Sequence, residues 1–171
     1  TFTYANALHR ALQRTASPEL VRGIYHGAMS VYLDRFLNVP PARLPEPTGD
    51  AGPSEPQLIL DALLERLDTQ QRVDDAARLV ARYLSLGHPT DRLFRTLAQA
   101  LLREDAEFHS FQMLEAGIRQ YEELEGAARA NHVLIAVARY LAAHSPTERA
   151  RHQTARIALR LQRGDALYEE G

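Results

Sequence analysis

The sequence predicts an all-α fold, with about seven helices stacked as hairpins in an irregular bundle or an α-solenoid. Three observations predict this fold class. Apolar residues recur at intervals of three and four along most of the chain, which is the period of a helix with one buried face. Short turns that contain proline separate these periodic stretches. One pattern also occurs twice, as VARYLSLGHPTDR at 80–92 and VARYLAAHSPTER at 137–149, and such repetition indicates stacked helical units.

The first two predicted helices form a hairpin. The first covers 3–14, and Ser17 then caps a second helix over 18–38, because serine is a favourable N-cap and proline follows it at the first helical position. The second helix is apolar around much of its circumference, which is typical of a helix at the centre of a domain. Gly23 and Gly27 leave a smooth strip along it, where another backbone can approach closely.

A proline-rich connection follows the hairpin. The segment 39–56 holds six of the nine prolines and cannot continue a helix, so we expect an extended surface connection. The hairpin 1–38 is too small to be stable alone, and we expect it to pack on a helical repeat core at 57–171 within one domain. Because the chain starts at Thr1, without methionine and already inside a helical pattern, we also expect a processed chain or a piece of a longer protein.

The repeat core is predicted to contain five helices. The longest covers 88–119, with Pro89 at its start, and we expect the other elements to be organised around it. The pair Ser145-Pro146 predicts the start of the last helix in the same way. The predicted ranges are 58–67, 73–86, 88–119, 127–143 and 146–162.

Composition excludes several classes of protein. A formal net charge of −2 gives the whole molecule no attraction to nucleic acid or to an anionic membrane. The chain has no cysteine, so it forms no disulfide and supplies no thiolate to zinc or to an iron–sulfur cluster. No apolar run approaches the roughly 20 residues of a membrane span. We therefore expect a cytoplasmic protein that binds neither nucleic acid nor membrane. All twenty basic residues are arginine, which we interpret as bacterial coding bias.

Acidic residues interrupt the apolar face of the helix predicted at 88–119. Asp105 and His109 stand four residues apart, so both side chains would lie on one helical face. Carboxylate and imidazole ligands on bundle helices form non-haem diiron and dimanganese sites, and an oxygen-rich set suits iron or manganese better than zinc. A further histidine would have to come from another helix. The candidates for a metal site or a polar pocket are Glu104, Asp105, His109, Glu115, His26 and His132.

Two other interpretations of these acids remain open. In a metal-free polar pocket, buried carboxylates would have raised pKa values unless they were paired, and they could serve in acid–base chemistry. Alternatively, the acids simply pair with nearby arginines such as Arg35, Arg82 or Arg119. The usual Glu-x-x-His pair of diiron proteins, Gly-rich phosphate loops and nucleophile elbows are all absent, so no catalytic residue is identified.

The last predicted helix carries a stripe of arginines. Such a stripe can meet phosphates or an acidic partner. Because no aromatic residues alternate with the arginines, we expect a solvated face or docking on the acidic segment 121–125, rather than nucleic-acid binding. The candidates for partner binding are Arg149, Arg156, Arg160 and Arg163.

Two stretches resemble known proteins. The runs TYANALHRAL and SPELVRGIYHGAMSVYLDRFLNVPPARLP resemble a helical segment of bacterial proteins that also carry a Rieske-type iron–sulfur domain. The run LLREDAEFHSFQMLEAGIRQYEEL is similar to the same group and to questin oxidase-like helical proteins. Together they cover about a third of the chain. The resemblance implies an oxidoreductase context, with an iron–sulfur domain in the same or a partner protein, because this chain lacks the cysteine ligands of a Rieske centre.

Two functions from different classes follow. The first is a helical domain of a bacterial redox protein, with a polar pocket that holds a metal or a small substrate. The alternative is a non-enzymatic helical-repeat scaffold that binds another protein. The pocket requires the acids to point inward and to converge with His26 or His132. The scaffold requires the acids to be salt-bridged and an exposed apolar groove of several hundred Å².

Overall fold

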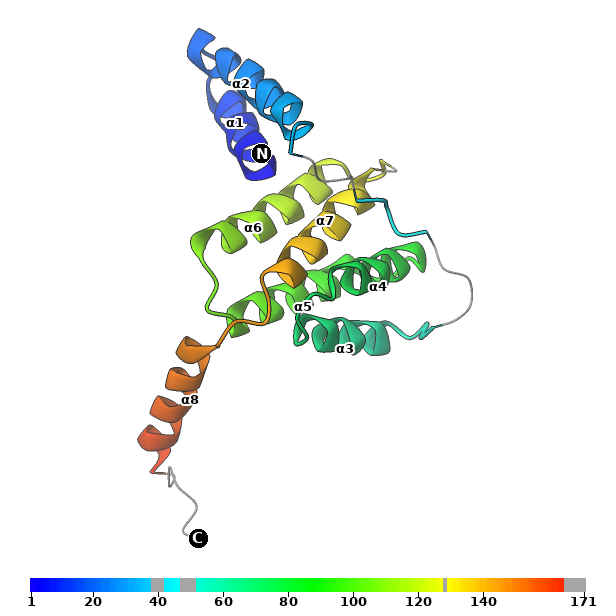
Figure 1. Cartoon of the computed structure of the whole chain (residues 1–171), viewed down its shortest axis with the longest axis vertical. Coiled ribbons are helices and arrows are strands. Elements are labelled where there is room, and N and C mark those ends of the chain that lie inside the picture. Colours follow the sequence, from blue (N-terminus) through cyan, green and yellow to red (C-terminus); the bar gives the residue numbers. More distant parts are fainter. Residues whose placement is uncertain (38–41, 47–51, 128, 165–171) are drawn as a thin grey trace.

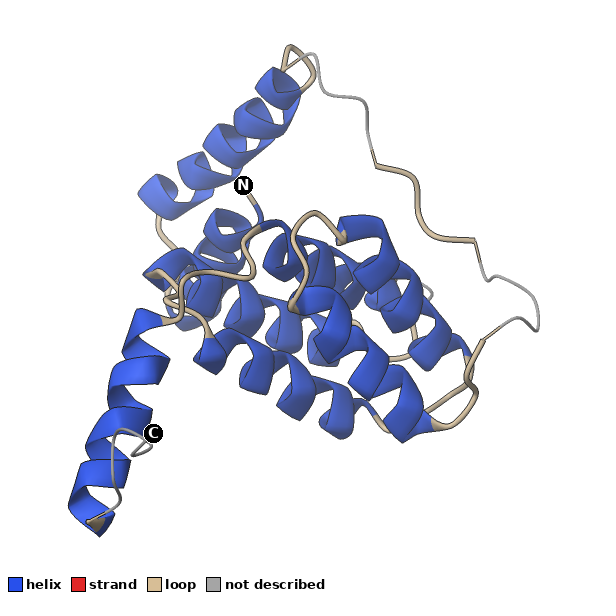
Figure 2. Ribbon diagram, turned by 60° about the horizontal axis from the view of Figure 1, so that its bottom comes forward, coloured by secondary structure: helices blue, strands red, loops and turns tan. Residues whose placement is uncertain are grey.

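The computed structural model describes residues 1–37, 42–46, 52–127 and 129–164. In these residues the chain forms eight helices and no strand, which confirms the predicted all-α fold (Figures 1 and 2). The helices are α1 Phe2–Arg14, α2 Pro18–Asp34, α3 Pro56–Leu67, α4 Val73–Ser85, α5 Thr90–Arg103, α6 Phe108–Glu123, α7 Ala130–Ala143 and α8 Ala150–Arg163.

The hydrophobic core lies between α3, α4, α5, α6 and α7. The two copies of the sequence repeat end the helices α4 and α7, and these two helices make the most extensive contact in the molecule. Tyr83 from the first copy and Val137 from the second are completely buried. Each large apolar side chain buried in this way contributes about 2 kcal/mol to folding. The repeat therefore forms the central helix pair of the core.

Close contacts hold α1 between α2 and α6, and α6 against α7. The Tyr4 hydroxyl of α1 donates to the Gly23 carbonyl oxygen at 3.0 Å, so α1 occupies the glycine strip of α2. On its other side α1 packs on α6, where the buried Asn6 amide accepts a hydrogen bond from Gln120 at 3.2 Å. Within the core, a Cβ atom at Gly117 of α6 would overlap the Val137 side chain of α7. Gly23 and Gly117 therefore set the spacing of α2 from α1 and of α6 from α7.

The prediction of one long helix over 88–119 was wrong. The chain forms α5 and α6 instead, with a break at 104–107 between them. Glu104 has the extended backbone angles φ −91° and ψ 157°, and its carboxylate accepts hydrogen bonds from a distant segment of the chain. The backbone N–H of Asp105 likewise donates to the distant Thr147 hydroxyl and not to a carbonyl oxygen of α5. Tertiary hydrogen bonds therefore satisfy polar groups at this break between the two helices.

The second helix is peripheral, and the expectation that it is central was also wrong. Among the described elements only α1 packs along α2 (Figure 1). A helix that is apolar around most of its circumference is normally buried on all sides. Here most of its large apolar side chains remain exposed. They include Val21, Ile24, Tyr25, Met29, Val31, Tyr32 and Leu33. The helix ends at Asp34, and residue 38 lies outside the described residues.

The last helix starts later than predicted and projects from the rest of the molecule (Figures 1 and 2). The prediction placed its start at Pro146, but α8 begins at Ala150. Arg149 directly precedes it with φ 57°, a left-handed conformation that non-glycine residues rarely adopt. All fourteen residues of α8 are exposed, and no described element packs along it.

Candidate functional site

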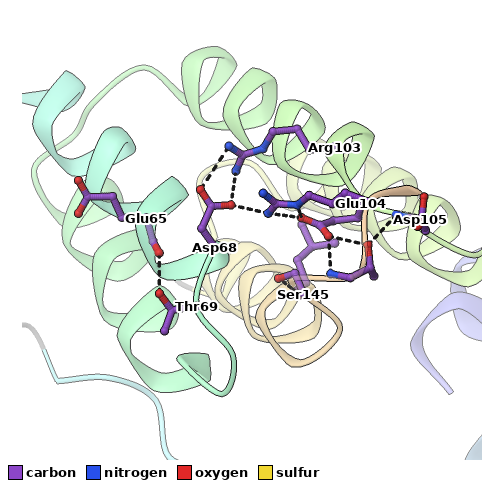
Figure 3. Close-up of polar contacts among 10 residues, drawn as sticks. Glu65, Asp68, Thr69, Arg103, Glu104, Asp105 and Ser145 are labelled. Carbon is purple, nitrogen blue, oxygen red and sulfur yellow. Dashed lines mark hydrogen bonds and ion pairs between the residues drawn. The ribbon is translucent and has the colours of Figure 1, made fainter. Parts of the chain in front are cut away.

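Glu104 is the centre of a polar cluster at the end of α5 (Figure 3). Its side chain is only 7% exposed. The carboxylate accepts hydrogen bonds from the Thr147 backbone N–H at 2.6 Å and from the Thr147 hydroxyl at 2.8 Å. It also accepts two from the Arg149 guanidinium, at 2.8 Å and 2.6 Å. The buried carboxylate is therefore fully engaged by the segment that leads into α8.

The Arg149 guanidinium extends this cluster to α3. It also binds the carboxylate of Asp68, which directly follows α3. Arg103, the last residue of α5, lies 3.1 Å from the same Asp68 carboxylate (Figure 3). Two arginines and two carboxylates thus join the ends of α3 and α5 to the start of α8. The left-handed backbone of Arg149 is held in place by these bonds.

Asp105 caps α8 from outside that helix. Its carboxylate accepts hydrogen bonds from the backbone N–H groups of Ala150 at 2.7 Å and Arg151 at 2.9 Å. Its own N–H donates to the Thr147 hydroxyl at 2.8 Å. The first N–H groups of a helix have no partner within the helix, and a carboxylate beside them also complements the helix dipole. Asp105 therefore fixes the first turn of α8 to the core.

The electrostatics favour the ionised forms of Glu104, Asp105 and Arg149. Burial by itself would raise the pKa of the Glu104 carboxyl, but the hydrogen bonds from Arg149 and Thr147 outweigh it, and the pKa lies below its usual value. The backbone N–H of Arg151 lowers the pKa of Asp105 most strongly. The bond to Glu104 in turn raises the pKa of the Arg149 guanidinium. Because a general base works best with a pKa near the operating pH, these two carboxylates are poorly suited to acid–base catalysis.

The other candidates do not join Glu104 and Asp105 in a metal site. Glu115 on α6 pairs with Arg119, as the arginine-pairing interpretation expected. His26 on α2 and His132 on α7 are both exposed. Across the described ranges, no group of three or more His, Cys, Asp or Glu side chains is placed to hold a metal ion. Glu104 pairs with the Arg149 guanidinium and not with Arg35 or Arg82, whereas Asp105 accepts from backbone N–H groups and not from an arginine side chain.

A pocket of about 370 Å³ lies beside the polar cluster. It brings His109 next to Glu104 and Asp105, whereas Glu115 does not line it. On its other side the His144 ring stacks on Tyr140 with 4.1 Å between centroids. The His144 Nδ1 lies 2.8 Å from the Tyr140 carbonyl oxygen, so Nδ1 carries the proton that it donates. The pocket is lined by Leu67, Ala100, Leu101, Glu104, Asp105, Ala106, Glu107, His109, Ser110, Tyr140, Leu141, His144, Ser145 and Thr147.

Sequence reasoning missed the role of His144 and Tyr140 in this pocket. His144 precedes a proline turn, so the sequence indicated only a structural position near a helix start. The available signal was the repeat itself, because the end of α7 carries the second copy and lies beside the end of α5.

The arginine stripe is divided between two environments. Arg149 lies before α8 and belongs to the polar cluster. Arg156, Arg160 and Arg163 lie on α8 and are exposed. The expected docking of this helix on the acidic segment 121–125 does not occur, because α8 does not pack along α6.

No described helix is both long enough and apolar enough to cross a lipid bilayer. No protein family matches the chain, and no curated protein or solved structure is significantly similar to it. The resemblance to helical proteins with a Rieske-type domain therefore stays a prediction. The described structure thus has charged residues, Glu104, Asp105 and Arg149, at the base of α8, a basic helix that projects from the core.

Proposed function

We propose that this chain is a helical scaffold that binds an acidic partner protein through α8. One observation carries the proposal: every residue of α8 is exposed, yet its first turn is fixed to the core. A helix of this length is marginal in water unless its apolar face is packed. The carboxylates of Glu104 and Asp105 anchor and cap that helix. This arrangement supports a role for α8 as a binding helix that is ordered before its partner binds.

The composition of α8 favours an acidic protein surface as its partner. The helix contains four arginines and no aspartate or glutamate. Ile157 and Leu161 lie on one face, beside the arc that carries the arginines. A basic amphipathic helix of this kind fits a shallow apolar groove with carboxylates along its rim. A membrane surface is less favourable, because α8 offers few large apolar residues and no aromatic residue for the interface.

The resemblance described above favours one class of partner. It implies an iron–sulfur domain in the same or a partner protein, and the absence of cysteine requires that domain to supply its own ligands. Under this proposal the chain belongs to a bacterial redox protein, in which α8 holds an electron-transfer domain with an acidic face. The docking chemistry of α8 does not depend on that assignment.

A peptide-binding experiment tests the proposal. The probe is a fluorescent amphipathic peptide with glutamates along one helical face and leucines along the adjacent face. We expect binding that weakens as salt rises, because exposed charges are screened over about 10 Å at moderate ionic strength. The variant with both Arg156→Glu and Arg163→Glu should bind at least about tenfold more weakly. Arg95→Glu, on exposed α5 surface, is the matched control and should bind normally. Equal binding by all three proteins, or none at low salt, would contradict the proposal.

The pocket favours a small-molecule site as a second candidate function, and the resemblance alone supplies its oxidoreductase context. His109, His144 and Tyr140 supply polar groups over an apolar floor that includes Leu101 and Leu141. The test is the metal content and the visible absorbance of protein purified without a metal-affinity column. Near-stoichiometric iron or manganese that is lost in His109→Ala would favour the pocket over the scaffold. The same metal content in both proteins would count against a role for His109.

A further inference from the structure

An exposed apolar surface runs along α2 and the turn that follows it. We call this the α2 face, and it consists of Val21, Ile24, Tyr25, Met29, Val31, Tyr32, Leu33 and Phe36. We propose that the α2 face is the interface of a homodimer, in which α2 of one copy packs on α2 of the second copy. The surface is separate from α8, which projects at the opposite end of the molecule (Figure 1).

The size of the α2 face matches that of a stable interface. Its members are between 43% and 73% exposed. Half of a large apolar side chain corresponds to about 100 Å², so the face presents on the order of 800 Å². A standard interface buries about 800 Å² on each partner, whereas the largest apolar patch on a typical monomer is about 300–600 Å². The exposed area thus equals what one partner buries in a standard interface, which is the area that a second copy would need.

The composition of the α2 face favours a second copy over a different partner. All eight members are uncharged, and Arg35, which follows α2, lies over Tyr32 and Phe36. Recognition of this face therefore rests on apolar contact rather than on complementary charges. Interfaces between identical subunits are instead apolar and resemble a divided core. The face therefore has the composition of a homodimer interface.

The centre of contact is already ordered in the single chain. The rings of Tyr32 and Phe36 pack edge to face with 5.5 Å between centroids. The Arg35 guanidinium covers both rings, at 5.2 Å from the Tyr32 centroid and 5.4 Å from the Phe36 centroid. Aromatic anchors that are rigid before association lose little entropy when they are buried, and such residues dominate binding energy.

The hairpin geometry allows a two-fold arrangement. α1 covers the glycine side of α2, and the α2 face lies largely on the opposite side of the helix. A two-fold axis pairs this face with the same face of the second copy, so each α2 lies between its own α1 and the partner's α2. A groove of about 360 Å³ between α1 and α2 adjoins the face and is lined by Tyr4, Leu8, Ile24 and Val31, among others. It offers space for side chains of the second copy, and the four helices form a bundle.

The oligomeric state of the full chain tests this proposal by light scattering and sedimentation over a range of concentrations. We expect a particle of twice the chain mass. Tyr25→Glu and Phe36→Glu, which place a charge in the face, should weaken dimerisation at least about 100-fold. Leu102→Glu on α5 is the matched control, because Leu102 is 69% exposed and lies outside the face. A monomeric native protein at its highest soluble concentration would overturn the proposal, as would a dimer that survives both face variants.

Two further measurements keep the test independent of folding. Far-ultraviolet circular dichroism should show the same helix content in all variants, because the substituted side chains lie outside the core. The chain has no cysteine, so a single introduced thiol reports proximity without interference. Tyr25→Cys near the middle of α2 should form a disulfide-linked dimer on mild oxidation, and Leu102→Cys should not. Equal cross-linking of the two variants would argue against the α2 face.

Discussion

The Asp105 carboxylate accepts a hydrogen bond from the backbone N–H of Arg151 at 2.9 Å, across a sequence separation of 46 residues. A residue at the end of α5 thereby caps a helix that otherwise touches little of the molecule. The neighbouring bond from Ala150 N–H shows that the contact is a cap and not a chance encounter. Glu104, Asp105 and α8 therefore act together, because the contacts of the two carboxylates determine the direction in which α8 projects.

Replacing Asp105 should release α8 without affecting the core. In Asp105→Ala the first N–H groups of α8 lose their acceptor, so the amide protons of Ala150–Arg163 should exchange with solvent faster than in the native chain. Exchange in α4 and α7 should not change. Hydrogen exchange followed by mass spectrometry measures both regions in one experiment. Asp105→Asn keeps an oxygen acceptor and should lie between the two. Unchanged exchange in α8 would show that the cap has no role in holding the helix.

Replacing Glu104 should destabilise the whole fold. Glu104→Gln removes the negative charge from a nearly buried group that accepts bonds from Arg149 and Thr147. Hydrogen bonds to charged groups contribute about 2 kcal/mol, which corresponds to a fall of about 5 °C in Tm for a chain of this size. Glu115→Gln is the matched control, because Glu115 is exposed and its pair with Arg119 contributes little. Thermal unfolding of the two variants distinguishes the two interpretations. If Glu104 has a structural role, only Glu104→Gln lowers Tm, whereas a metal site that contains both carboxylates would be weakened by either variant.

Local patterns in the sequence were sufficient to predict the fold class and the repeat. Ser17 caps α2 as predicted, accepting a hydrogen bond from Leu20 N–H at 3.2 Å. The arrangement at Glu104 could not be predicted, because its partners Thr147 and Arg149 lie more than 40 residues away and no local pattern links them. Apolar residues resume the same helical period after the break, which is why one long helix was predicted. An interruption of the apolar face by carboxylates was the visible signal, and it marked a helix end.

The position of α2 was unpredictable for a different reason. Its apolar circumference correctly indicated a need for burial, but a sequence pattern does not reveal which surface satisfies that need. In the described structure α1 covers only one side of α2. The side of α2 that α1 leaves exposed is the side that the proposed homodimer would bury.

The stability of the fold should fall in acid. Both Glu104 and Asp105 have pKa values below those of the unfolded chain, which are about 4.3 and about 3.9. As the pH falls through about 4, the unfolded chain therefore takes up protons that the folded chain does not, and the free energy of unfolding decreases. Their contribution is complete above about pH 5 and is lost below the lowered folded values. Denaturant titrations of the native chain and of Glu104→Gln should give a shallower pH dependence in the variant. An identical pH dependence of stability in the two proteins would show that these contacts do not lower the pKa of Glu104.

Gly117 should tolerate no larger residue while Val137 remains in place. Alanine normally stabilises a helix by about 1 kcal/mol relative to glycine. At this position, however, the added Cβ would overlap the Val137 side chain in the tightly packed contact of α6 with α7, and overpacking costs about 1–3 kcal/mol. We expect Gly117→Ala to lower the free energy of unfolding, as measured by urea denaturation. Adding Val137→Ala removes the overlap, so the loss in the double variant should be smaller than the sum of the two single losses. Strict additivity would mean that α6 and α7 can move apart, and the glycine would then not set their spacing.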